Sequence, residues 1–320
     1  MSVRSLLFEG GGREREIEIN ADTLREIGDE RLVWVGIEGD GADERTRIAE
    51  LVGIDAASIA PSANGRYPVL DRHDSTVELH LLDLQKAEPD AATRPLDVVV
   101  GSNWAITASA TTPGYLEELE KQLRGDPEVG NLDSPAFLAA LLDSHLTGFY
   151  RLIDELERHV DEVDRGLLAG RPQRHVLERL ARLRASAALV RRALVAHRDL
   201  YATLARPDLL PIARSDSAPH FKALMERHER AVDALESVRS QIHGSFEVYM
   251  TRVAQRTNDT MKALTILSAV LLPSVALAGI MGMNFRVGFF ENPNGFWMVI
   301  GAMTILALAT IAIGRWRGWL

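Results

Sequence analysis

Two hydroxyl side chains, Thr265 and Ser268, lie within a run of residues that carries no charge, from Leu264 to Asn284. At helical spacing they share one side with other small residues, and this side is smaller and more polar than the opposite one. The members of this stripe are Thr265, Ser268, Leu272, Val275 or Ala276, and Gly279. Such a stripe can let another helix pack closely, or it can line a water-filled path. The pattern leaves both interpretations open.

The run that carries this stripe is long enough to cross a membrane. About 20 uncharged residues span the roughly 30 Å hydrocarbon core of a bilayer as a helix. A second uncharged run, from Phe296 to Gly314, follows after a short polar connection. The sequence therefore predicts two membrane-spanning helices. Because one chain with two spans cannot enclose a water-filled path, a pore would require a symmetric ring of subunits.

Basic residues predict the orientation of these spans. They flank the two spans on their outer sides in the sequence, whereas the connecting loop carries only Arg286. The flanking residues are Arg252, Arg256 and Lys262 before the first span, and Arg315 and Arg317 after the second. The positive-inside rule then places both termini in the cytoplasm. The first fifteen residues lack the apolar core of a signal peptide, which agrees with this orientation. We expect a multi-pass protein of the inner or plasma membrane.

The composition excludes several classes of protein. The chain has 320 residues, of which 46% are hydrophobic and 25% charged, and it contains no cysteine, so disulfides and thiolate metal sites are excluded. The formal net charge of -9 argues against a nucleic-acid partner. No nucleophile–base pair or cofactor loop is evident, and Gly10–Gly12 precede a strand pattern rather than a helix, which indicates a turn. We expect neither an enzyme nor a bound cofactor.

Residues 1–112 are predicted to form an α/β domain with a small sheet. Two short β-like runs on either side of Gly10–Gly12 predict a strand-turn-strand unit, and four further runs predict strands. The predicted strands are Ser5–Phe8, Glu16–Ile19, Leu32–Ile37, Thr76–Leu82, Leu96–Val100 and Trp104–Ala108. Helical patterns lie near Thr23–Ile27 and Ala42–Val52.

Residues 113–219 are predicted to be helical. Asp133 and Ser134 before Pro135 provide a helix start, and apolar residues then recur at spacings of three and four until Gly170. A second helix is predicted from Gln173 to Ala205, and the two can pair as an antiparallel hairpin. Residues 206–219, with three prolines, read as a loop.

One continuous helix is predicted from residue 220 to 283, about 95 Å long. Residues 220–263 would form a stalk with a heptad-like seam, and residues 264–283 the first span, which Pro273 can bend. The seam residues are Phe221, His228, Leu235, Ile242 and Tyr249 at one position, and Leu224, Ala231 and Val238 at the other. An external loop (284–295), the second span (296–314) and a cytoplasmic tail (315–320) would follow.

The first span also carries a resemblance to a known family. Asn258–Thr265, Leu272–Pro273 and Ala278–Phe285 resemble the first span of the CorA-type divalent metal ion transporters, whose signature is Gly-Met-Asn at its outer end. A looser likeness extends over the chain and includes Asn103–Thr107 and Ile153–Glu157. The resemblance implies an α+β membrane protein that assembles as a funnel-shaped homopentamer, in which the first span lines a pore for divalent cations.

The resemblance also implies the residues of the site. Gly282, Met283 and Asn284 would form the selectivity entrance. The implied pore-lining residues are Asn258, Met261, Leu264, Thr265, Ser268, Leu272, Val275 and Gly279. Because Mg²⁺ is small and dehydrates reluctantly, a ring of Asn284 amide oxygens that contacts the hydrated ion would avoid most of the dehydration cost. Leu264 and Leu272 would be hydrophobic constrictions, and Asn258 the inner gate.

Gating in the family responds to intracellular metal bound by carboxylates between subunits. The candidates in this chain are Asp154, Glu155, Asp161, Glu162 and Asp164. Such a run can equally be a solvated face of a helix. Of the nine His residues, His220, His228 and His243 are expected to pack or lie on the surface rather than bind zinc.

The loop after the signature departs from the Met-Pro-Glu of many magnesium transporters, because Phe285-Arg286-Val287 stands there. Glu291 could still attract cations, whereas Arg286 would repel them unless it is paired. We expect transport of Mg²⁺, with Co²⁺ and Ni²⁺. The alternative is Zn²⁺ transport, as in the ZntB-like branch, with or without proton coupling, and a membrane-anchored sensor is a third interpretation.

Overall fold

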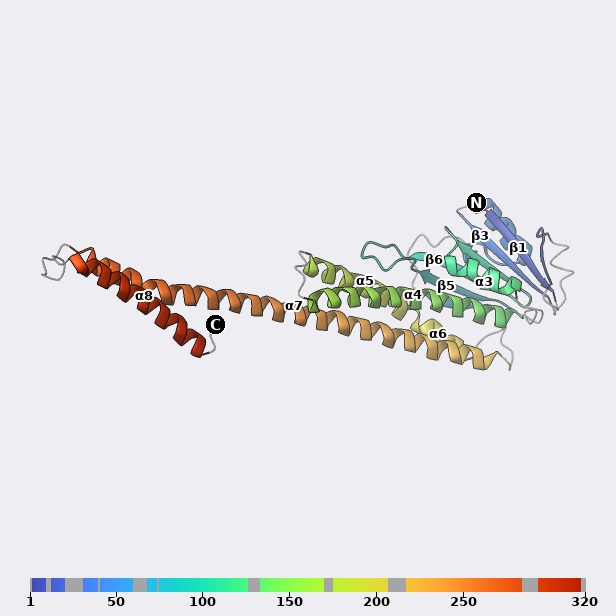
Figure 1. Cartoon of the computed structure of the whole chain (residues 1–320). Helices are drawn as coiled ribbons and strands as arrows, with labels where there is room; N and C mark the ends of the chain where they lie inside the picture. The colour runs from blue at the N-terminus through green and yellow to red at the C-terminus, as the bar shows by residue number, and fades with distance from the viewer. Residues whose placement is uncertain are drawn as a thin grey trace. The chain divides into compact units, whose positions relative to one another are not determined.

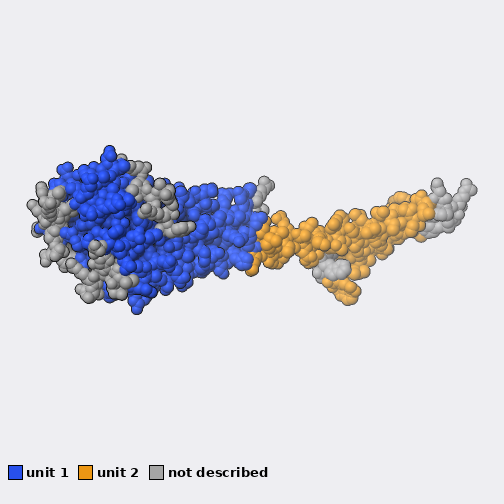
Figure 2. Space-filling model, turned by 180° about the vertical axis from the view of Figure 1, so that it is seen from behind, with its two compact units in different colours: residues 1–246 blue, residues 247–320 orange. Residues whose placement is uncertain are grey.

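A computed structural model of the chain describes residues 2–9, 13–20, 31–39, 41–59, 68–73, 75–125, 133–169, 175–206, 217–283 and 293–317. The chain divides into two compact units, residues 1–246 and 247–320, which Figure 2 colours separately. Gly10–Gly12 and the helix expected near Thr23–Ile27 lie outside the described residues.

Within the described residues, seven strands form one mixed sheet in the first unit (Figure 1). Their order is β2-β1-β3-β7-β6-β5-β4, and neighbouring strands are antiparallel except β3 and β7, which are parallel. The strands are β1 Ser2–Glu9, β2 Arg13–Glu16, β3 Leu32–Glu38, β4 Val69–Arg72, β5 Val77–Asp83, β6 Arg94–Val100 and β7 Trp104–Ser109.

The described residues also form seven α-helices and one short 3₁₀ helix. They are α2 Ala42–Val52 and η1 Ala56–Ile59, between β3 and β4, and then α3 Gly114–Gly125, α4 Ser134–Leu168, α5 Val176–Ala196, α6 Arg198–Leu204, α7 Ala218–Met281 and α8 Pro293–Trp316. α4 begins where the sequence predicts, because the Asp133 side chain accepts a hydrogen bond from the Ala136 N–H at 2.9 Å. α4 and α5 run side by side in Figure 1, as the predicted hairpin requires.

Strand β3 is buried on both faces because helices cover both sides of the sheet. Val33, Val35 and Ile37 join one hydrophobic core with residues of α2 and η1. On the other face Trp34 contacts Phe137 of α4, with ring centroids 5.2 Å apart, and donates its Nε1–H to Thr107 Oγ1 at 3.0 Å. The contact between Trp34 and Phe137 holds the sheet against α4, which also packs beside α5 and contacts α7.

The predicted seam of the long helix is confirmed over most of its length. The buried residues of α7 are Phe221, Leu224, His228, Ala231, Leu235, Val238, Ile242 and Ser245. Tyr249 is half-buried, so its place in the seam stays a prediction, and the fully buried part of the seam ends at Ser245. α7 remains one helix through Pro273, as predicted.

Three other predictions are corrected. The helix expected from Gln173 to Ala205 is interrupted at His197, whose N–H bonds to Leu194 O at 3.2 Å instead of continuing the α-helical pattern. Strand β2 ends at Glu16, before the predicted Ile19. The edge strand β4 was not predicted, because its four residues are mostly exposed and show no apolar alternation.

Gly101 lies in the tight turn between β6 and β7, where its N–H donates to Trp104 O at 2.9 Å. A Cβ at this position would lie 2.4 Å from Trp104 Cε2, so the indole or the turn would have to move. We expect Gly101→Ala to lower the free energy of unfolding by about 1–3 kcal/mol, as overpacking does. Thermal unfolding followed by tryptophan fluorescence measures this loss. Gly114→Ala is the matched control, since a Cβ there meets nothing within 4 Å, and equal unfolding temperatures of the two variants would contradict the argument.

Candidate functional site

The stripe of small and polar residues lies on an exposed face of α7. Leu264 is 63%, Leu272 67% and Val275 64% exposed. The opposite face of the helix is half-buried instead, and its residues are Ile266, Val270, Pro273, Ser274, Leu277 and Met281. At 100° per residue, the centres of the two faces lie about 170° apart. Ser268 is the exception, because it belongs to the stripe and is half-buried.

Helix α8 accounts for the half-buried face of α7. Most of its own covered residues fall on one side, and these are Gly295, Val299, Met303, Ala307, Thr310 and Gly314, whereas the half-buried Gly301 lies elsewhere on the helix. The described part of the second unit contains only α8 and the end of α7, and Figure 1 shows α8 running back beside the end of α7, so we infer that each helix covers this face of the other. The stripe is therefore not the surface on which α8 packs.

The Thr265 hydroxyl is oriented by its own helix. It donates to Met261 O at 2.8 Å, which leaves the lone pairs of the oxygen free to accept from water. At Gly279, a Cβ would meet nothing within 4 Å, so the helix surface is open there. This exposed face thus offers a hydroxyl acceptor and space to a hydrated solute.

Helix α7 ends where the predicted entrance begins. The Gly282 N–H donates to Ala278 O at 2.9 Å, and the Met283 N–H donates to Ile280 O at 3.2 Å, so the helix closes at Gly282. Asn284 and Glu291 lie outside the described residues. The entrance formed by Gly282, Met283 and Asn284 therefore stays a prediction.

The acidic candidates all lie on α4 but do not form one cluster. Glu162 pairs with Arg179 of α5, and the hydrogen bond from that guanidinium lowers the pKa of Glu162. Asp154 and Asp161 are exposed, while Glu155 and Asp164 are half-buried. Within the part of the chain that the structure describes, no group of three or more His, Asp or Glu side chains could hold a metal ion. A regulatory site between subunits stays a prediction.

The three histidines considered as possible zinc ligands differ in their burial. His228 is buried and its Nε2 lies 2.9 Å from Leu194 O, which confirms a packing role. His220 and His243 are exposed.

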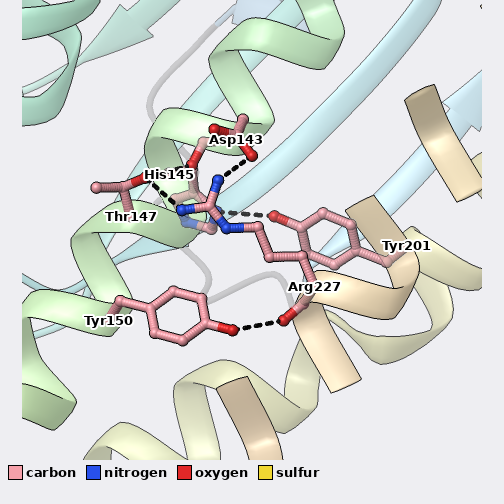
Figure 3. Close-up of polar contacts among 6 residues, drawn as sticks. All are labelled: Asp143, His145, Thr147, Tyr150, Tyr201 and Arg227. Atoms are coloured by element: carbon pink, nitrogen blue, oxygen red, sulfur yellow. Dashed lines mark hydrogen bonds and ion pairs between the residues drawn. The ribbon is translucent and has the colours of Figure 1, made fainter. Parts of the chain in front are cut away.

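Sequence reasoning missed a polar contact between α7 and α4 (Figure 3). Arg227 of α7 forms an ion pair with Asp143 and donates to Thr147 Oγ1 at 2.9 Å. The Tyr150 hydroxyl donates to Arg227 O at 3.1 Å, and the guanidinium carbon lies 5.4 Å from the centre of the Tyr150 ring. Asp143, Thr147 and Tyr150 recur at spacings of four and three, which was the available signal for a polar face toward α7.

Both C-terminal helices are long and apolar enough to cross a membrane, and the apolar window of each is 0% buried inside the chain. Exposed apolar surface of this extent requires an apolar environment outside the chain. The fold thus defines a class: a mixed-sheet domain, long helices and two candidate C-terminal membrane helices.

Comparison with known proteins identifies the family. The sequence profile described as "CorA-like Mg2+ transporter protein" matches residues 29–313. The "Cobalt/magnesium transport protein CorA" of Methanocaldococcus jannaschii is 24% identical over 295 residues, which cover 91% of this chain and 92% of that protein. The "Divalent cation transporter CmaX" of Pseudomonas aeruginosa is 29% identical over 181 residues, 56% of this chain and 51% of that protein.

The fold has a solved counterpart. The complete structure of the CorA magnesium transporter from Methanocaldococcus jannaschii matches with a TM-score of 0.83 over 100% of both chains, at 22% sequence identity. The chain belongs to the CorA-like Mg²⁺ transporter protein family.

Proposed function

We propose that this chain transports divalent metal cations across a membrane, as a homopentamer whose central path is lined by the stripe on α7. The observation that carries the proposal is the exposure of this face, opposite the face on which α8 packs. The same face in a ring of subunits would enclose a path. Membership of the family and the names of the relatives support divalent cations as the transported solute.

Transport in this proposal begins at the outer end of α7. A ring of Asn284 amide oxygens accepts hydrogen bonds from the water shell of the ion, so that the ion enters without a fixed negative charge that would trap it. Gly279, one turn below, leaves room for the hydrated ion. The Thr265 oxygen then offers a further acceptor inside the path, and rings of Leu272 and Leu264 exclude water when the path closes.

The driving force is the membrane potential. An inside-negative potential favours entry of a doubly charged ion by about 4.6 kcal/mol per 100 mV, twice the value for one charge. This orientation requires both termini in the cytoplasm, with residues 1–263 and 315–320 inside, spans at 264–283 and 296–314, and residues 284–295 outside. The basic residues that flank the spans support it.

Mg²⁺ is the proposed ion, with Co²⁺ and Ni²⁺ as further substrates, and Zn²⁺ is the alternative. The relative that matches over 91% of this chain is named for cobalt and magnesium, which favours Mg²⁺. The loop after Gly282–Asn284 lacks the Met-Pro-Glu sequence of many magnesium transporters, and Zn²⁺ is therefore retained as the alternative ion. Flux into liposomes, compared among these ions with and without a pH gradient, decides between them and tests for proton coupling.

Because the chain contains no cysteine, single cysteines can test the pore face directly. In Val275→Cys, a positively charged, membrane-impermeant thiol reagent is expected to react and to abolish most Mg²⁺ flux into liposomes, since the new charge would stand in the path. Leu267→Cys is the matched control, because Leu267 is also exposed, at 55%, but lies about 120° around the helix from the centre of the stripe and about 80° from Val275. If Val275→Cys does not react, or if both variants react equally, the stripe does not line a water-filled path.

A further inference from the structure

Three histidines gather with a tyrosine in the interior of the first unit, at the junction of four elements. His145 of α4, His197 between α5 and α6, and His228 of α7 are at most 1% exposed. The rings of His145 and His197 lie 4.9 Å apart, and His228 stacks on Tyr201 of α6 at 4.8 Å. None of these residues contributes to the proposed pore.

Hydrogen bonds to the backbone of β5 fix the tautomers of two of these histidines. The Leu82 N–H donates to His197 Nε2 at 3.1 Å, so His197 carries its proton on Nδ1, which donates to Ala193 O at 2.7 Å. The Leu82 carbonyl can only accept, so His145 carries its proton on Nε2, 3.3 Å away. His145 Nδ1 then accepts from the Tyr201 hydroxyl at 3.2 Å (Figure 3). Neutral imidazoles satisfy every one of these bonds.

A second proton on the ring of His197 or His228 would disrupt these hydrogen bonds. On His197 it would add an Nε2–H that faces the Leu82 N–H, donor against donor. On His228, Nε2 already donates to Leu194 O, and the buried Nδ1 has no hydrogen-bond partner, so a proton there would be an unsatisfied buried donor. The geometry therefore requires His197 and His228 to be neutral, whereas a second proton on His145 would make the Tyr201 hydroxyl turn from donor to acceptor.

One surrounding group acts in the opposite direction: burial raises the pKa of Asp83 to about 6, so below pH 6 its protonation favours the closed state and removes about one factor of ten per pH unit from the combined effect of the histidines. The titratable and charged residues around the three rings are Asp83 of β5, Tyr115 of α3, Asp143 of α4, Arg198 and Tyr201 of α6, and Arg227 and Glu229 of α7. Asp143 is paired with Arg227. Burial lowers the pKa of His145 to about 4, and burial lowers the pKa of His197 and of His228 as well.

We propose that His145, His197, His228 and Tyr201 form an acid-sensitive clamp that holds the end of β5 and the first half of α7 on the same helical layer, and that acid releases it. The sign follows from proton binding. Well above pH 6.5, the ordinary pKa of histidine, the histidines are neutral in both the closed and the opened clamp, so their titration has no effect there. Below pH 6.5 the opened histidines bind protons that the closed ones cannot, so opening becomes more favourable as pH falls.

Amide hydrogen exchange of the full-length protein in lipid nanodiscs tests the clamp. After correction for the intrinsic effect of pH, protection of the Leu82 amide is expected to fall by about tenfold per pH unit for each histidine released. His197→Gln keeps a side-chain oxygen that can accept from the Leu82 N–H but cannot titrate. The slope in this variant is therefore expected to be lower by about one factor of ten per pH unit.

His175→Gln is the matched control, because the His175 side chain is 80% exposed, and it should leave the slope unchanged. His228→Gln provides a second titration-silent variant if His197→Gln does not fold. Protection that is independent of pH below 6.5, or a slope that neither variant lowers, would overturn the clamp.

The test of the clamp is independent of the test of the transport proposal. Because exchange is measured without ion flux, failure of the clamp leaves the pore proposal intact, and absence of transport leaves the clamp intact. An effect of acid on flux rests on the proposed function, since α7 carries both the clamp residue His228 and the proposed pore face.

Discussion

Asn284→Ala is expected to lower Mg²⁺ flux into liposomes by about tenfold or more. A hydrogen bond between an amide oxygen and the polarised water of a divalent ion is charge-assisted, and losing one such bond costs about 1.5 kcal/mol, which corresponds to about a tenfold change. In a ring, each subunit loses the same oxygen. The methyl group of alanine offers no acceptor in its place, so the ion would shed water without compensation or remain outside.

The control for this substitution is Asn294→Ala, which removes the same amide at the start of α8. Asn294 is exposed and lies at the other end of the connecting loop, outside the proposed ring of Asn284. The two variants should be compared at equal reconstituted amounts and with the oligomeric state verified in detergent. Undiminished flux through Asn284→Ala, or equal losses in both variants, would show that Asn284 is not the selectivity entrance.

Local signals predicted the elements whose structure depends on their own residues. Asp133 before Pro135 marked the start of α4, and alternating or continuous apolar runs marked β3, β5, β6 and β7. The break at His197 was missed because it coincides with a bond to the Leu82 N–H, a backbone group distant in sequence that no side chain announces. β4 was missed because a short exposed edge strand has no buried face to impose a period.

In the candidate site, too, only the residues that a local sequence pattern marks were predicted. The stripe on α7 was found because its spacing encodes a helix face, and the exposure of Leu272 and Val275 is consistent with it. In the proposed ring, other copies of the chain would lie next to that face, and their number could not be derived from the spacing of residues in one sequence. The cluster of buried histidines was not predicted, because each histidine is isolated in the sequence. Only packing brings His145, His197 and His228 together.

The same substitution at two positions of α7 is expected to change stability at one position and transport at the other. Leu235 is 1% exposed in the seam, whereas Leu264 is 63% exposed and lies on the same side of α7 as Val275 of the stripe. Leu235→Ala should lower the free energy of unfolding by about 3 kcal/mol, because a buried leucine loses its transfer free energy and leaves a cavity. For a unit of this size the loss corresponds to an unfolding temperature about 6–12 °C lower. Differential scanning fluorimetry in detergent measures it.

Leu264→Ala should leave the unfolding temperature nearly unchanged, because no packing within the chain is lost. Its effect should appear in transport instead. A ring of alanines widens a hydrophobic constriction and makes it easier to wet, so flux under conditions that close the path should rise. If Leu264→Ala lowers the unfolding temperature as much as Leu235→Ala and leaves flux unchanged, then Leu264 packs as a core residue and the exposed face of α7 is not the wall of a path. Because helix and substitution are the same in both variants, the difference between them isolates the environment of each leucine.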